Sequence, residues 1–304
     1  MSYPYITDIF HSAFGTNWSL PIPTFGVIVA AAVAVATGVA RAEARRLESR
    51  GWLAPSTHAV VSDLVLVSVL AGLVGARVFD ILDHPASFLA HPLAEIFTRT
   101  GFSIYGGLCF GFIAGAIFLK RREIPVAPML DAVAPSLMLG YAIGRLGCQL
   151  SGDGDWGIAS NLALKPQWLP HWLWAQTYDG NILGITIPAP GVYPTPLYES
   201  LVCLALFALL WRLRRGGERP GYLFSIYLIL AGFERLLVEK IRINPRHDWI
   251  GIPLTQAELI SFLLVLVGLG GVIWTLAGRR IWLRVLLAAG VLVALSACVP
   301  LQVG

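Results

Sequence analysis

The sequence predicts an all-α polytopic membrane protein, a seven-span helical bundle with an eighth span at the C-terminus. Three observations predict this class. Hydrophobic residues make up 56% of the 304 residues and charged residues only 13%, about half the charged share of a soluble domain. Apolar runs long enough to cross a bilayer recur along the whole chain. Ionisable residues stand near the ends of several runs, where a charge in a membrane protein marks a functional site.

The apolar runs give the expected spans in order, each long enough to cross as a helix. They cover about residues 22–43, 58–82, 103–119, 127–147, 196–213, 220–239, 254–277 and 281–299. We expect one membrane domain over residues 1–278, with an outer loop at about 150–195 that is rich in tryptophan. Residues 279–304 hold the additional C-terminal span.

Basic residues decide the orientation. Fourteen of the 22 lysines and arginines follow the first, third, fifth and seventh expected spans, and five fall on the other side. By the positive-inside rule the fourteen face the cytoplasm, so the N-terminus faces outward. The other three, Arg77, Arg145 and Arg235, fall near the outer ends of the second, fourth and sixth spans. This distribution predicts a polar site in the outer leaflet.

Composition also limits the function classes. The net charge of +4 does not indicate nucleic-acid binding, because the basic residues lie in short loops between spans. The four cysteines lack metal-ligand spacing, so we expect no metal, no cofactor and no disulfide framework. The first apolar run has no basic region before it, which argues against a cleaved signal peptide.

The stretch 144–157 joins an arginine, two aspartates and several glycines at the end of an apolar run. The planar fork of Arg145 suits bidentate contact with a phosphate; an arginine that only snorkels from a helix end is the alternative. Asp153 and Asp155 could orient Arg145 or accept a proton. Turn chemistry is the alternative for both, and we favour it for Asp155.

Three further groups of residues lie near the outer ends of their expected spans, as the stretch 144–157 does. Arg235, Glu239 and Arg242 are spaced i, i+4, i+7 and so share one helical face, as a polar network or as a structural ion pair. Residues 193–199 begin the fifth span with two prolines, and residues 103–108 begin the third with paired glycines. Tyr198 and Glu199 lie in the first of these segments and Tyr105 in the second. For all three, packing or capping is the alternative to a role in the site. Together the groups predict one site that binds a lipid headgroup.

These motifs resemble the signature of bacterial prolipoprotein diacylglyceryl transferases over about residues 20–278. The matching pieces are Gly-Arg-Leu-Gly at 144–147 with Gly152-Asp153 and Trp156-Gly157, Tyr-Gly-Gly-Leu at 105–108, Pro-Thr-Pro-Leu-Tyr-Glu at 194–199, Gly75-Ala76-Arg77, Leu130-Asp131 with Ala134-Pro135, and Arg235 with Glu239. The ordered set is specific, although each piece alone is weak.

The resemblance implies a seven-span enzyme of lipoprotein biosynthesis in the bacterial inner (cytoplasmic) membrane, with its N-terminus in the periplasm. Such an enzyme transfers diacylglyceryl from phosphatidylglycerol to the lipobox cysteine of prolipoprotein signal peptides and releases glycerol phosphate. It implies that Arg145 holds the headgroup and that Arg235 and Glu239 belong to the catalytic network. The wider set of substrate-binding residues expected is Arg77, Arg145, Gly147, Cys148, Gly157, Tyr198, Glu199 and Arg242.

The chain departs from better-known members of that family. It has Tyr105 where they have histidine, Cys148 where they usually have asparagine, Asp153 where they have glutamate and Phe25 where they have tyrosine, and its turn is one residue longer. The general base is therefore open. We expect Glu239 or Asp153 to take the thiol proton while Tyr105 donates a hydrogen bond. A transporter or non-catalytic binder of an anionic lipid or solute, and a member inactivated at Tyr105 and Cys148, are the alternatives.

The C-terminal span has the layout of a lipoprotein signal peptide. Arg279 and Arg280 precede an apolar stretch that ends in Leu295-Ser296-Ala297-Cys298. This segment could occupy the enzyme's own groove or be modified at Cys298. An ordinary eighth span that ends in small residues is the alternative.

Overall fold

The computed structural model describes residues 2–15, 20–90, 92, 103–216, 219–244, 247–249 and 252–277. These residues are mostly α-helical, with two short 3-10 turns and one small hairpin. The helices are α1 (Ile6–Phe14), α2 (Thr24–Ser49), α3 (Thr57–Asp83), α4 (Pro85–Ala90), α6 (Ile104–Arg121), α7 (Val126–Ser151), α8 (Thr195–Leu213), α9 (Tyr222–Glu239) and α10 (Gln256–Ala277). The strands β1 (His247–Trp249) and β2 (Ile252–Leu254) pair antiparallel.

The first seven expected spans correspond to α2, α3, α6, α7, α8, α9 and α10. Five of these helices, α2, α3, α7, α8 and α10, are long and apolar enough to cross a membrane by length and composition. The all-α membrane class is therefore confirmed, whereas the number of spans stays a prediction. The eighth expected run, 281–299, lies outside the described residues, as does Cys298.

Helix α7 is longer than the expected span, which ended at about residue 147. The helix runs to Ser151, so Arg145 lies inside it and the glycine-rich turn begins only at Gly152. Gly147 stays helical because it packs against α2: an added Cβ would lie 3.2 Å from the Phe25 ring and 3.4 Å from Ile28. The glycine therefore permits close helix packing at this point.

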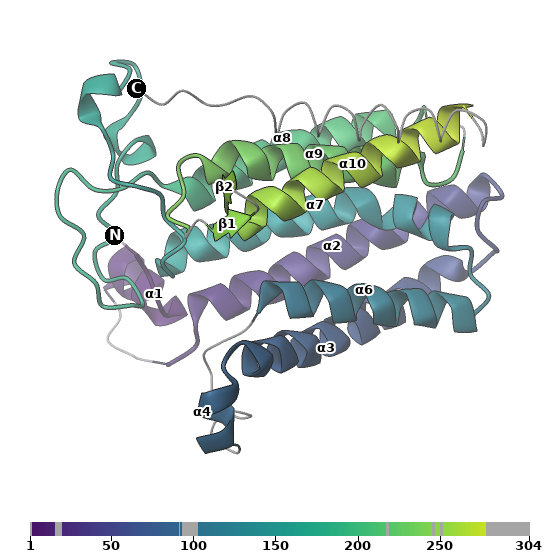
Figure 1. Cartoon of the computed structure of the whole chain (residues 1–304), viewed down its shortest axis with the longest axis horizontal. Helices are drawn as coiled ribbons and strands as arrows, with labels where there is room; N and C mark the ends of the chain where they lie inside the picture. Colours follow the sequence, from purple (N-terminus) through teal and green to yellow (C-terminus); the bar gives the residue numbers. More distant parts are fainter. Residues whose placement is uncertain are drawn as a thin grey trace. The chain divides into compact units, whose positions relative to one another are not determined.

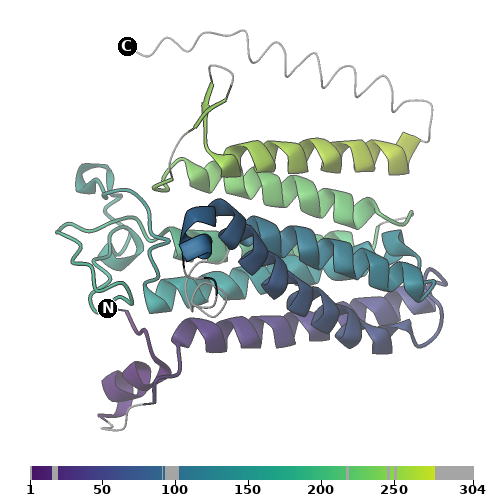
Figure 2. The ribbon, with the colours of Figure 1, turned by 60° about the horizontal axis from the view of Figure 1, so that its bottom comes forward.

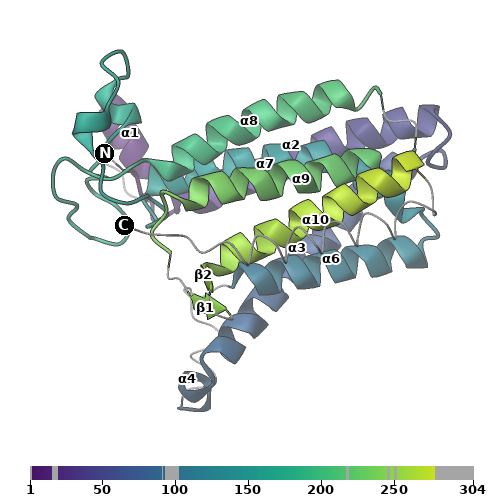
Figure 3. The same cartoon turned by 45° about the horizontal axis from the view of Figure 1, so that its top comes forward.

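The helices form two compact units, whose boundaries fall inside α2 and α7. The larger unit comprises Met1–Ala36 and Val133–Gly304, and the smaller unit comprises Thr37–Ala132. In the larger unit α8, α9 and α10 run side by side (Figures 1 and 3). Its apolar core joins α7, α8 and α9 through buried residues Ala134, Met138, Ala142, Cys203, Leu210 and Leu223.

Small residues bring α9 and α10 close together within the larger unit. An added Cβ at Gly232 would lie 2.6 Å from the Ser261 carbonyl oxygen, and one at Gly268 would lie 2.6 Å from the Ser225 carbonyl oxygen. Such contacts between small residues are the usual way that membrane helices gain van der Waals packing. They fix α9, which carries Arg235 and Glu239.

The smaller unit is organised around α3 and α6, which run side by side (Figure 2). Gly75 and Gly106 face each other where the helices cross, and an added Cβ on either would meet the other's carbonyl oxygen. The Ser103 amide also donates to the Ala76 carbonyl at 3.0 Å, just before α6 begins. The paired glycines anticipated near residue 106 thus serve close helix packing.

Replacing Gly106 by alanine is expected to destabilise the protein. The new Cβ would meet the Gly75 carbonyl oxygen and lie 2.7 Å from the Phe79 Cβ, so the helices must separate at a cost of about 1–3 kcal/mol. A thermal melt in detergent measures this. Gly38→Ala on α2, where nothing lies within 4 Å of the new Cβ, is the matched control and should leave the melting temperature unchanged or higher. Equal melting temperatures for the two variants would contradict the packing argument.

Candidate functional site

A buried carboxylate, Glu199, organises the polar site of the larger unit. Its side chain in the first turns of α8 is fully buried. Arg242 Nη1 lies 2.9 Å from one of its oxygens and Arg145 Nε pairs with the other. The Tyr141 hydroxyl donates to the same carboxylate at 2.7 Å, and Arg235 Nη1 lies 3.8 Å away. Three guanidiniums from two segments far apart in the sequence, one around residue 145 and one at 235–242, thus meet at one carboxylate.

Asp155 forms the second bridge between two of these arginines. Arg145 Nη1 pairs with one of its oxygens, and Arg242 Nη2 lies 2.7 Å from the other. Burial alone would raise the pKa of Asp155, but the two guanidiniums outweigh burial and hold it below its usual value. The interpretation of Asp155 as turn chemistry alone is therefore wrong, because both of its oxygens bind arginine.

A third carboxylate, Glu239, completes the network at the end of α9. Arg235 Nη2 lies 3.1 Å from one Glu239 oxygen, and the Asn244 amide donates to the other at 2.8 Å. The Glu239 side chain is almost fully buried. The i, i+4 spacing of Arg235 and Glu239 therefore produces an ion pair, as expected.

Backbone pairing between the loop after α7 and the segment after α9 holds Arg242 next to Asp155 and Glu199. Gly157 pairs with Arg242 in an isolated antiparallel bridge, and the Ile158 amide donates to the Ile241 carbonyl at 2.9 Å. An added Cβ at Gly157 would lie 2.5 Å from that carbonyl oxygen, so glycine is required for this approach. The Thr195 hydroxyl donates to the Asp155 carbonyl at 2.7 Å and ties the same loop to α8.

Cys148 and Asp153 lie beside the network. The Cys148 sulfur is 3.6 Å from Arg145 Nη1. Its sulfur and one oxygen each of Asp153 and Asp155 lie within 4.8 Å of one another. A carboxylate that two guanidiniums already neutralise attracts a cation weakly, so the group is better suited to arginine than to a metal ion. Burial raises the pKa of the half-buried Asp153, which makes this carboxylate a stronger base.

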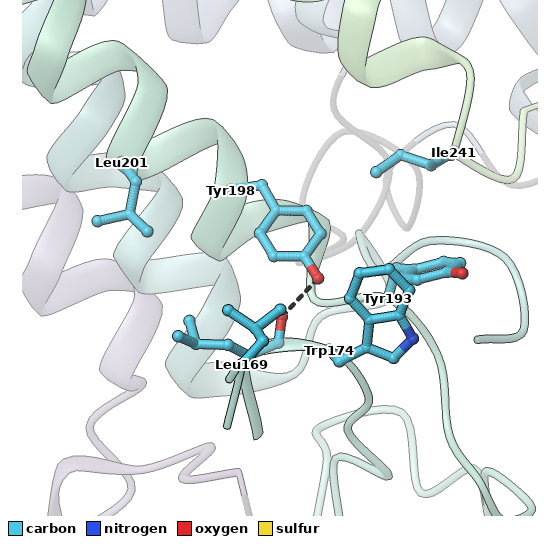
Figure 4. Close-up of a pocket in the computed structure, with 7 residues that line it drawn as sticks. Leu169, Trp174, Tyr193, Tyr198, Leu201 and Ile241 are labelled. Atoms are coloured by element: carbon cyan, nitrogen blue, oxygen red, sulfur yellow. Dashed lines mark hydrogen bonds between the residues drawn. The ribbon is translucent and has the colours of Figure 1, made fainter. Parts of the chain in front are cut away.

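An apolar cavity of about 490 Å³ lies next to the polar network. Figure 4 shows Tyr198 and Leu201 of α8 facing Leu169, Trp174, Tyr193 and Ile241 across it. The Tyr198 hydroxyl donates to the Leu173 carbonyl at 2.5 Å. Tyr198 and Glu199 are neighbours in sequence, yet Tyr198 lines the cavity while Glu199 binds the arginines.

The expected site residues divide between the two units. Arg145, Cys148, Asp153, Gly157, Glu199, Arg235, Glu239 and Arg242 gather in the larger unit. Arg77 and Tyr105 belong to the smaller unit, where Arg77 Nη1 binds Asp80 at 2.8 Å and Tyr105 lies in the first turn of α6. Their roles, like the contact of Gly147 and Tyr198 with substrate, stay predictions.

The site also contains side chains that the sequence did not single out. Tyr141 accepts a hydrogen bond from Arg145 Nε at 3.0 Å, and the Arg145 guanidinium carbon lies 5.1 Å from the centre of its ring. Their i, i+4 spacing on α7 was a usable signal. Glu234 is buried beside Arg235, and one of its oxygens has no hydrogen-bond partner in the described part of the chain. Asn244 had no local signal.

The fold and the site define an all-α membrane protein with a buried cluster of arginines and carboxylates at one end of its helices. A sequence profile of prolipoprotein diacylglyceryl transferases matches residues 12–274. Phosphatidylglycerol–prolipoprotein diacylglyceryl transferases of several bacteria are similar over most of the chain. The Leptospira interrogans (serogroup Icterohaemorrhagiae serovar copenhageni) protein is 29% identical, with 87% of this chain and 92% of the relative aligned. The Geobacillus kaustophilus protein is 32% identical (86% and 90% aligned), and the Thermus thermophilus protein 31% (82% and 93%). The chain belongs to the prolipoprotein diacylglyceryl transferase family.

Proposed function

We propose that this protein transfers diacylglyceryl from phosphatidylglycerol to the cysteine thiol of a prolipoprotein signal peptide and releases glycerol phosphate. The convergence of Arg145, Arg235 and Arg242 on Glu199 carries this proposal. Guanidiniums recognise phosphate through paired hydrogen bonds, and they stabilise the negative charge that grows on a departing phosphate. The names of the relatives supply the two substrates.

The proposed location is the bacterial inner membrane, with the N-terminus and the long loop on the periplasmic side. The distribution of basic residues supports this orientation. The N-terminus and that loop lie together: the Ser2 amide donates to the Asp179 carbonyl at 2.8 Å, and the Tyr3 amide donates to the Leu150 carbonyl at 2.6 Å. These contacts support an arginine network on the same side as the N-terminus, where a lipid headgroup would meet it.

In the proposed reaction the thiolate sulfur attacks the carbon of the diacylglyceryl group that is bonded to the phosphate oxygen. A carbon–sulfur bond forms, the carbon–oxygen bond breaks, and glycerol phosphate leaves with the bonding electron pair. A free thiol has a pKa of about 8.5, so a base must take its proton. Arg145 and Arg242 bind the phosphate, and their charge favours both the thiolate and the leaving group.

Asp153 is the better supported of the two candidate bases. Its carboxylate is half-buried, and burial raises its pKa towards the range in which a base works well. Glu239 is almost fully buried, and its oxygens face Arg235 and Asn244. We therefore assign proton transfer to Asp153 and the positioning of Arg235 to Glu239.

Asp153→Asn is expected to lower kcat about 10²-fold, the usual contribution of a general base. A base must be ionised, and the pKa of Asp153 is raised, so the wild-type rate should fall as the pH drops through that pKa. The acidic limb of the pH–rate profile should disappear in Asp153→Asn and persist in Glu239→Gln and Tyr105→Phe. Loss of turnover in Tyr105→Phe with a mild effect of Asp153→Asn would make this assignment wrong.

The function itself is tested with purified protein, phosphatidylglycerol and a prolipoprotein. The expected result is a mass increase of one diacylglyceryl group on the peptide cysteine, with stoichiometric release of glycerol phosphate. Complementation of a strain depleted of this activity provides the test in cells. Binding of phosphatidylglycerol without product would instead indicate a transporter or a non-catalytic lipid-binding protein.

A further inference from the structure

Asp155 differs from the other two carboxylates of the network in exposure. Its side chain is 34% exposed, whereas those of Glu199 and Glu239 are 0% and 1% exposed. Glu199 and Glu239 belong to helices, but Asp155 belongs to the turn that follows α7. A molecule that enters the network from solvent would therefore meet Asp155 before the other two carboxylates.

The way in which Asp155 is held matches the way in which arginines hold a phosphate. Arg145 and Arg242 come from different segments, and each directs one Nη atom to a different oxygen of the same carboxylate. A phosphate monoester or diester presents a similar pair of oxygens to two guanidiniums. The Asp155 carboxylate thus occupies the position that a phosphate would take between the guanidiniums of Arg145 and Arg242.

The charge balance means that one anion must leave when a phosphate enters. Arg145, Arg235 and Arg242 already have one ion-pair partner each in Asp155, Glu199 and Glu239, and Asp153 and Glu234 lie beside them as further carboxylates. The cluster therefore has no positive charge to spare, and adding a phosphate would bring one more anion into a partly buried place, where unpaired charge is costly. Asp155, the most exposed of the three paired carboxylates, is the one that can return to water.

The backbone lets the side chain leave without moving the loop. Gly152 and Gly154 adopt positive φ angles of 63° and 100°, which shape the turn, and the Thr195 hydroxyl holds the Asp155 carbonyl at 2.7 Å. The turn therefore stays in place while rotation about the side-chain bonds of Asp155 releases its carboxylate. An aspartate in water is ionised at neutral pH, so the carboxylate of Asp155 leaves the arginines as an anion.

We propose that Arg145 and Arg242 form a phosphate-binding site and that Asp155 is its internal counter-ion, which the phosphate displaces on binding. This inference rests on the proposed function for the identity of the lipid but not for the binding of phosphate. It assigns Asp155 a role in setting affinity: its carboxylate competes with the headgroup of the substrate and with the phosphate of the product.

Asp155→Asn tests the proposal, because it removes the charge and keeps the size of the side chain. The variant should bind inorganic phosphate about five- to tenfold more tightly than the wild type, as shown by the concentration that raises Tm in detergent. The KM for phosphatidylglycerol should fall by a similar factor, as should the inhibition constant of glycerol phosphate. The matched control is Asp179→Asn in the same loop, an exposed carboxylate that should leave all three values unchanged.

Unchanged or weaker phosphate binding in Asp155→Asn would overturn the proposal and show that Asp155 only braces the arginines. If Asp155→Asn does not fold, Asp155→Ser provides the same test and must show the same tightening. Asp155→Glu retains the charge and should bind phosphate no more tightly than the wild type; tightening in this variant would also overturn the proposal. Since Tm shifts with phosphate need no turnover, a failure of the transferase assay would leave this test intact.

Discussion

Arg145→Ala is expected to reduce diacylglyceryl transfer by about 10²–10³-fold, the usual effect of removing a group that stabilises transition-state charge. Arg145 contacts Asp155 and Glu199 together, and its guanidinium packs over the Tyr141 ring. Alanine removes the proposed phosphate contact and leaves both carboxylates with one partner fewer. The measurement is the initial rate of transfer from phosphatidylglycerol to a prolipoprotein, with complementation of a depleted strain as the cellular counterpart.

Arg145→Lys separates charge from geometry. Lysine keeps a positive charge but lacks the planar fork that reaches two carboxylates at once, so we expect it to recover only a small part of the rate. The control is Arg122→Ala, which removes an exposed arginine after α6 and should retain wild-type activity. If the rate of Arg145→Ala is within about twofold of wild type, the loss is smaller than the removal of a single transition-state contact causes. That result would refute the phosphate-binding role.

The helices were predictable because the signal that forms them is local. An apolar run of membrane length must satisfy its backbone internally, so it becomes a helix whatever it packs against. The end of α7 was misplaced for the opposite reason: glycine at Gly147 favours a turn locally, but packing against Phe25 keeps it helical. Tertiary contact decided that boundary.

The members of the site were more predictable than their pairing. Arg235 and Glu239 are four residues apart, so helical geometry alone brings them together. Arg242 meets Asp155 across 87 positions of sequence and Glu199 across 43, and no local pattern encodes such contacts. Asp155 was assigned to turn chemistry because an aspartate beside glycine has the same sequence pattern in either role.

Glu199→Gln is expected to disrupt both stability and activity. The fully buried carboxylate neutralises Arg145 and Arg242 and accepts a hydrogen bond from Tyr141. Glutamine keeps the shape but leaves a buried positive charge uncompensated, which costs about 3–5 kcal/mol. Thermal melts in detergent should show a lower Tm, and the transfer rate per folded molecule should fall about 10²-fold because the arginines are no longer positioned.

Glu258→Gln is the matched control for that variant. Glu258 is also buried, but its carboxylate binds Lys240 at 2.7 Å, outside the arginine network. Its loss can lower Tm without lowering the transfer rate per folded molecule. Equal loss of rate in both variants would mean that Glu199 acts only through general stability.

The two neutralising substitutions in the network should therefore act in opposite directions on phosphate binding. Asp155 is the most exposed of the three paired carboxylates and is proposed to compete with the phosphate, so its neutralisation should tighten binding. Glu199 is buried and contacts the arginines to which the phosphate is proposed to bind, so its neutralisation should weaken binding. If charge alone governed affinity, both variants would bind phosphate more tightly. Opposite Tm responses to inorganic phosphate would thus separate positioning from charge balance in the same cluster.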